Sequence, residues 1–246
     1  VMIIAPFLSW QKTAKKILIK KLILLLILTI FGTFIFYYLK PSSIFGLICG
    51  SLSISLGISI ILEIFNKLKS TKQNFLLDIK KINLLPKNFF GMIIAHLGLA
   101  VFLAGITGEQ FFKIQFEKEV TINQKFKLGQ YEILFSNVKE VNGPNYVSKS
   151  AEFDIFLEKK IVKKIISEKR FYTAEKSQTT EAGIYSSFFK DIYIVFGNKV
   201  KANEWIIKAY LNPMVTWIWL GASLMALGGL VSIIGLKNRK ILKIED

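Results

Sequence analysis

Four long uncharged stretches constrain the fold of this 246-residue chain more than any other feature. Each is close to the roughly 20 apolar residues that cross a bilayer as a helix. Composition agrees, because 52% of the residues are hydrophobic, more than a soluble domain of this size usually carries. The sequence therefore predicts a polytopic α-helical membrane protein with four transmembrane helices, at residues 22–39, 42–64, 88–108 and 213–236.

The positions of the basic residues predict the orientation. Outside residues 109–212, every lysine and arginine except Lys40 lies in one of three segments, 11–21, 65–87 and 237–246. Four alternating spans place all three segments on one side, and positively charged loops stay in the cytoplasm. We expect a basic segment at 11–21, a basic loop at 65–87 and a tail at 237–246 in the cytoplasm, with residues 109–212 outside. Topology thus explains the net charge of +16, and no nucleic-acid partner is expected.

The first ten residues have an unusual order. Residues 1–10 (VMIIAPFLSW) are apolar, too short to span a bilayer, and precede the basic stretch, whereas a signal peptide has its basic residues first. One interpretation is the end of a truncated helix, which makes the chain a fragment or one half of a split protein. The other is a short interfacial segment.

Residues 109–212 change from a helical to an alternating pattern. Segments rich in Ile, Val, Phe and Tyr read as strands, and turn residues separate them. The predicted strands are Phe111–Phe116, Tyr131–Val141, Ala151–Leu157, Ile161–Tyr172, Asp191–Phe196 and Trp205–Leu211. The sequence therefore predicts a small antiparallel β domain, a barrel or a sandwich, inserted between the third and fourth helices.

Two residue counts exclude most soluble enzyme chemistry. One cysteine, Cys49, excludes an internal disulfide, a CxxC redox pair and a zinc or iron–sulfur site with several cysteine ligands. One histidine, His96, excludes a multi-histidine metal centre built by this chain alone. A Ser–His–Asp triad outside the membrane lacks its histidine as well.

His96 itself is the main candidate residue, because it falls near the middle of the third apolar stretch. An ionisable side chain at that depth is costly and faces protein rather than lipid. A neutral imidazole there can be an axial ligand to haem iron, with Ala100, one turn further on, leaving room for the flat macrocycle. The alternative is a histidine that hydrogen-bonds across a helix contact.

Small residues recur at helical spacing in three of the stretches and indicate close helix packing rather than activity. The expected contact stripes are Gly46, Gly50, Ser53 and Gly57; then Gly91, Ala95, Gly98 and Gly105; and finally Ala222, Ala226 and Gly229. In the β domain, the run Lys169–Tyr172 alternates basic and aromatic residues. It fits either an anionic ligand, such as haem propionates or an unfolded polypeptide, or a solvated strand edge.

Several spaced motifs resemble one family. They are GMIIAHLGLAVFLAGIT in 91–107, VKEVNGPNY in 138–146, EKRFY in 168–172, TEAGI in 180–184, KDIYIVFG in 190–197 and WIWLGASLMALGGLVS in 217–232. In this order they are similar to the C-terminal portion of the CcmF/CycK family, the haem lyase subunit of bacterial cytochrome c maturation.

The resemblance implies a multi-pass protein of the bacterial inner membrane, with residues 109–212 in the periplasm. It implies participation in covalent attachment of haem to apocytochrome c, with a haem chaperone and a thiol-handling maturation subunit as partners. It further implies a haem b in the membrane held by two histidines, of which His96 matches one. His96 would then be both the cofactor-binding residue and the metal ligand, with no catalytic residue assigned.

The departures from the family pattern matter equally. The family's Trp-rich haem-handling motif, its two flanking histidines and the second haem b ligand are absent from this sequence. We therefore expect that the chain alone is not a competent lyase and that it acts with an N-terminal half or a split subunit. The alternative from another class is a non-catalytic transporter subunit with a periplasmic domain that transmits motion.

Overall fold

The computed structural model describes residues 15–39, 43–69 and 87–242. The expected segment 1–10, the first residues of 11–21, most of the loop 65–87 and the end of the tail 237–246 lie outside the described residues. The chain divides into a helical unit, residues 1–111 with 217–246, and a β unit, residues 112–216. Each unit is described by itself below.

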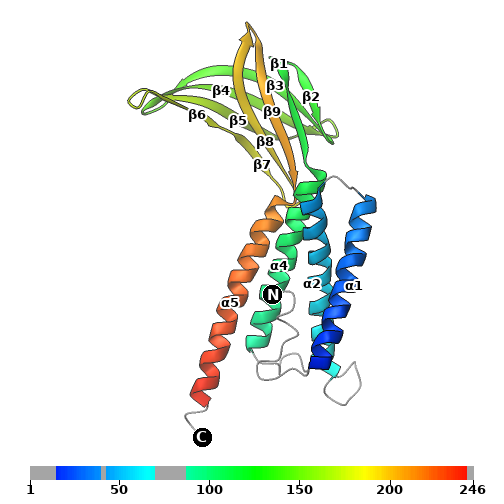
Figure 1. Cartoon of the computed structure of the whole chain (residues 1–246). Coiled ribbons are helices and arrows are strands. Elements are labelled where there is room, and N and C mark those ends of the chain that lie inside the picture. Colours follow the sequence, from blue (N-terminus) through cyan, green and yellow to red (C-terminus); the bar gives the residue numbers. More distant parts are fainter. Residues whose placement is uncertain (1–14, 40–42, 70–86, 243–246) are drawn as a thin grey trace. The chain divides into compact units, whose positions relative to one another are not determined.

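The described residues of the helical unit form four helices (Figure 1). They are α1 (Lys15–Leu39), α2 (Ile44–Lys69), α4 (Lys87–Phe112) and α5 (Val215–Leu242). Three contain a stretch long and apolar enough to cross a membrane, namely Ile44–Phe65, Lys87–Phe112 and Val215–Ile234. The apolar part of α1 within the described residues, Leu26–Tyr38, is shorter. The helices lie where the four spans are predicted, and their crossing of a membrane stays a prediction.

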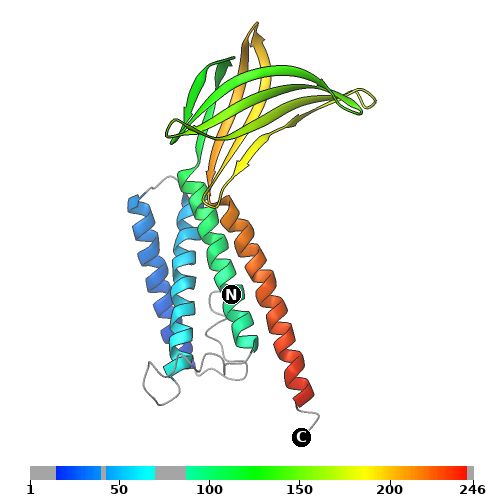
Figure 2. The same cartoon turned by 180° about the vertical axis from the view of Figure 1, so that it is seen from behind.

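Helix α2 lies between α1 and α4 (Figure 2), and hydroxyl side chains join it to both. Towards α1, the hydroxyls of Thr29 and Ser55 lie 3.0 Å apart. Towards α4, Ser53 Oγ donates to the backbone oxygen of Ala100 at 2.8 Å, beside a buried cluster of Leu56, Ile60 and Ala100. In an apolar medium such bonds satisfy polar groups that have no water molecules as hydrogen-bond partners.

Glycines bring α4 and α5 into backbone contact. A Cβ on Gly98 would lie 2.6 Å from Met225 N, and one on Gly221 would lie 2.5 Å from Phe102 N. Of the stripe expected on α4, Gly91, Ala95 and Gly98 meet the α5 backbone. The stripe expected on α5 is wrong, since the contacting face carries Gly221 and Gly228, whereas Gly229 has nothing within 4 Å of a Cβ built on it. Gly57 of α2 is equally open.

Nine strands in two antiparallel sheets form the β unit (Figures 1 and 2). The four-stranded sheet has the order β1-β9-β8-β7, and the five-stranded sheet has the order β2-β3-β4-β5-β6. The strands are β1 (Ile114–Thr121), β2 (Lys125–Leu128), β3 (Tyr131–Asn142), β4 (Tyr146–Leu157), β5 (Lys160–Tyr172), β6 (Ser177–Glu181), β7 (Gly183–Ser186), β8 (Lys190–Lys201) and β9 (Glu204–Pro213).

Alternating side chains from both sheets fill one core, which makes the unit a β-sandwich. Phe135 and Phe153 of the larger sheet are fully buried and stack at 5.1 Å, and Phe196 of the smaller sheet packs on Phe135 at 6.2 Å. Of the two predicted architectures, the sandwich is the one that forms. The strand predicted at Phe111–Phe116 is wrong at its start, because Phe111 and Phe112 end α4 and the strand begins at Ile114.

Ser167 joins the two sheets through a buried hydroxyl. Its Oγ donates to the Glu181 backbone oxygen at 2.8 Å and accepts from the Phe196 backbone nitrogen at 3.1 Å. Ser167 lies on β5, whereas Phe196 lies on β8 of the other sheet, and Ser167 is fully buried. The single hydroxyl therefore gives a hydrogen-bond partner to two backbone groups, the Glu181 oxygen and the Phe196 nitrogen.

We expect Ser167→Ala to lower the unfolding free energy of the β unit by about 1–3 kcal/mol, the usual cost of leaving a buried backbone group unsatisfied. Denaturant unfolding of the full chain in detergent, followed by near-ultraviolet circular dichroism, measures the change. Ser150→Ala is the matched control, since Ser150 is also buried but makes no side-chain hydrogen bond among the described residues. Equal losses in both variants would contradict the bridging role.

Candidate functional site

The ring of His96 is held in place by its own helix. His96 lies on α4, where its side chain is half-buried, and Nδ1 is 2.7 Å from the backbone oxygen of Met92, one turn earlier. A carbonyl oxygen only accepts, so Nδ1 carries the proton in this bond. The ring orientation is thus fixed by the backbone rather than by another side chain.

That bond sets which nitrogen of His96 can act. In neutral imidazole, a protonated Nδ1 leaves Nε2 with its lone pair, and a carbonyl that accepts from the other nitrogen is the usual second partner of a metal-ligating histidine. Within the described part of the chain, Nε2 has no hydrogen-bond partner. The arrangement is compatible with a single axial nitrogen ligand, and among the described residues His96 makes no hydrogen bond across a helix contact.

The space beside Ala100 differs from the prediction. Ala100 is buried, and it packs against Leu56 and Ile60 of α2 while its carbonyl accepts from Ser53. No flat group can lie over Ala100, so that part of the expectation is wrong. Leu97, which follows His96 in the sequence, is exposed. Among the described residues no cluster of three or more His, Cys, Asp or Glu side chains could hold a metal ion.

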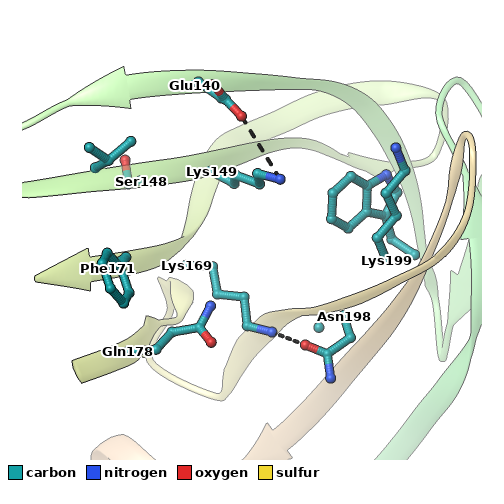
Figure 3. A pocket seen from close by; sticks show the side chains of 11 residues that line it. Glu140, Ser148, Lys149, Lys169, Phe171, Gln178, Asn198 and Lys199 are labelled. Atoms are coloured by element: carbon teal, nitrogen blue, oxygen red, sulfur yellow. Dashed lines mark hydrogen bonds and ion pairs between the residues drawn. The ribbon is translucent and has the colours of Figure 1, made fainter. Parts of the chain in front are cut away.

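A cleft in the β unit collects basic and aromatic side chains from several strands (Figure 3). Its volume is about 360 Å³. Lys149 on β4 and Lys169 on β5 extend toward the part of β8 that carries Asn198 and Lys199. The lining residues are Glu140, Val147, Ser148, Lys149, Lys169, Phe171, Gln178, Gly197, Asn198, Lys199 and Trp205.

Two lysines of this cleft lie near one indole ring. The Nζ atoms of Lys149 and Lys199 lie 6.0 and 5.6 Å from the centre of the Trp205 ring. Lys149 also faces Glu140 at 3.8 Å, and Lys169 donates to the side-chain oxygen of Asn198. With three lysines and one glutamate, the lining is positively charged.

The run Lys169–Tyr172 splits between two faces of β5, as strand alternation requires. Lys169 and Phe171 line the cleft. Arg170 lies over the Tyr146 ring at 4.7 Å and donates to Glu168 at 2.8 Å, a hydrogen bond that raises the pKa of the guanidinium. The sequence did not single out Lys149, Lys199 or Trp205, because only strand register brings them to Lys169.

Comparison with known proteins matches both units. Residues 111–213 match the family model described as the CcmF C-terminal beta-sandwich. CcmF of Haemophilus influenzae, a cytochrome c-type biogenesis protein, is 28% identical over 237 residues, which are 96% of this chain and 36% of that protein. CcmF of Pseudomonas aeruginosa is 34% identical over 155 residues, 63% of this chain and 24% of that protein. The chain therefore spans about a third or less of the length of these relatives.

A solved structure shares the fold. A cytochrome c heme lyase CcmF structure superimposes with a TM-score of 0.66 at 16% identity, over 94% of this chain and 37% of that one. The motifs in the third apolar stretch, the β-sandwich and the last helix occur in one order along the chain. The matched sandwich and the relatives together identify the chain as corresponding to the C-terminal portion of CcmF, and the solved structure shares its fold.

Proposed function

We propose that the chain is the C-terminal part of a cytochrome c haem lyase subunit, which takes part in covalent attachment of haem to apocytochrome c. The relatives named as cytochrome c-type biogenesis proteins support this role. They favour it over the alternative, a transporter subunit that transmits motion. The orientation of His96 supports the same choice, because such a subunit has no use for a histidine whose Nε2 is left available.

The proposed topology has four transmembrane helices in the bacterial inner membrane, with residues 109–212 in the periplasm. The three long apolar helices support the spans, and the basic segments at 11–21, 65–87 and 237–246 support the orientation. The sandwich then lies in the compartment in which c-type cytochromes receive their haem.

His96 is the proposed axial ligand to a haem b. The observation that carries this assignment is the bond from Nδ1 to the Met92 oxygen, which orients the ring and leaves Nε2 as the available nitrogen. The second ligand comes from another polypeptide segment, because His96 is the only histidine of the chain. When bound, the haem supplies a one-electron redox centre within the membrane, and the apolar residues of α4 keep water away from it.

The partners proposed for the periplasmic domain are the haem chaperone, the thiol-handling maturation subunit and the apocytochrome. Its exposed basic residues and its cleft offer a surface to them. The remaining N-terminal half of the protein, or a split subunit equivalent to it, is the proposed partner of the helices.

Purification from native membranes in mild detergent, followed by reduced-minus-oxidised spectroscopy, tests the proposal. We expect a b-type haem signal in the complex that contains this chain, and co-purification of other maturation proteins identified by mass spectrometry. A complex that contains the maturation proteins but no haem would contradict the cofactor assignment. A complex with a transport ATPase and no maturation protein would favour the transporter alternative.

A further inference from the structure

We propose that the cleft of the β unit binds an extended acidic peptide segment of a protein partner, which adds along the open part of β8. The proposal deepens the docking part of the proposed function by naming the surface and the chemistry of the segment that it takes. It does not depend on His96 or on haem.

The edge of β8 is only partly covered. β7 pairs with β8 over Asp191–Ile194, and the next outward backbone nitrogen, that of Phe196, bonds to Ser167 Oγ. From Gly197 to Lys201 no strand of the described chain pairs with that side of β8. Unpaired backbone groups on a strand edge are a template for another extended chain.

Positive charge lies along this same edge. Lys199 is on the open part of β8, and Lys149 and Lys169 reach toward it from β4 and β5 (Figure 3). The contact of Lys169 with Asn198 is one between exposed side chains. Carboxylates of an incoming segment can replace the amide as partner of Lys169 and form stronger, charge-assisted hydrogen bonds.

The floor of the cleft gives the segment an apolar contact. Trp205 is 7% exposed, and its Nε1 is buried without a hydrogen-bond partner among the described residues. Phe171 and Val147 also line the cleft and are exposed, so an aliphatic side chain of the incoming segment has an apolar surface to cover.

The length of the cleft favours a peptide over a small anion. A second cavity of about 250 Å³ shares Glu140, Lys149, Lys199 and Trp205 with the first and continues it past Lys139 and Asn203. A single phosphate or acetate would occupy only a small part of this groove. Alternating acidic and apolar residues match it, because successive side chains of a strand point to opposite faces.

Fluorescence anisotropy with the full chain in detergent tests the inference. The probe is a labelled peptide of about six alternating Glu and Val residues, the usual length of a strand. One control peptide carries Gln in place of Glu, and another carries N-methylated amides on its pairing edge. We expect the Glu peptide to bind at least about tenfold more tightly than either control, and added salt to weaken it.

Protein variants locate the site. Lys149→Ala with Lys199→Ala should weaken binding of the Glu peptide about tenfold. Lys127→Ala with Lys163→Ala removes the same charge from exposed positions that do not line the cleft, and should change binding less than about twofold. Equal losses in both double variants, equal binding of the Gln peptide, or displacement of the peptide by equimolar inorganic phosphate would each overturn the proposal. None of these outcomes bears on the haem spectrum, so the two proposals fail separately.

Discussion

His96→Ala is expected to remove the b-type haem signal from the purified complex while leaving the chain in the membrane. Loss of groups that merely orient a ligand costs about 10–100-fold in metal affinity, so loss of the ligand itself should cost at least that much. No other histidine of the chain can take its place. Haem content per protein, measured by pyridine haemochrome and by reduced-minus-oxidised spectra, reports the change.

Two controls separate ligation from structure. Leu97→Ala alters the exposed neighbour of His96 and should leave the haem content unchanged. Imidazole added to His96→Ala should restore part of the signal, since the free base can supply the missing nitrogen, whereas it cannot repair a misfolded helix. A full b-type signal in His96→Ala would argue against the ligand assignment. So would a combined result in which His96→Ala fails to accumulate in the membrane and Leu97→Ala also loses the signal.

The sequence could predict the helices, but not which face of a helix packs against its neighbour. Apolar length and charge position identify four helices from the sequence, and the depth of His96 marks it as unusual. The face of α5 could not be predicted, because Gly221 and Gly228 and the small residues Ala222 and Ala226 have similar helical spacing. Which set meets α4 depends on how the partner helix lies, and one helix does not contain that information.

The β unit was predictable where strands are long and apolar. β2, β6 and β7 are short, of four, five and four residues, and β6 (SQTTE) has no apolar alternation at all. Their strand state comes from pairing with longer neighbours. The cleft could be predicted only through Lys169 and Phe171. Lys149, Lys199 and Trp205 belong to other strands, and in so lysine-rich a chain neither lysine stands out.

The contact of Gly228 with α4 leads to the second large prediction. A Cβ at Gly228 would lie 2.4 Å from the backbone nitrogen of Ala95 and 2.6 Å from the backbone oxygen of Gly91. Backbone atoms of a helix cannot turn aside as a side chain can. We therefore expect Gly228→Ala to push the two helices apart and to cost at least about 1–3 kcal/mol of the stability of the helical unit, and Gly228→Leu to cost more.

Gly229→Ala is the matched control, one position further along the same helix. A Cβ there has nothing within 4 Å, so the change should be neutral or slightly stabilising through the higher helix propensity of alanine. Unfolding in mixed micelles, followed by far-ultraviolet circular dichroism, compares the two variants. Since Ala95 precedes His96, displacement of α5 by Gly228→Ala should also lower the haem content, whereas Gly229→Ala should not. Equal stability of the two variants would mean that α4 and α5 are not held in this backbone contact.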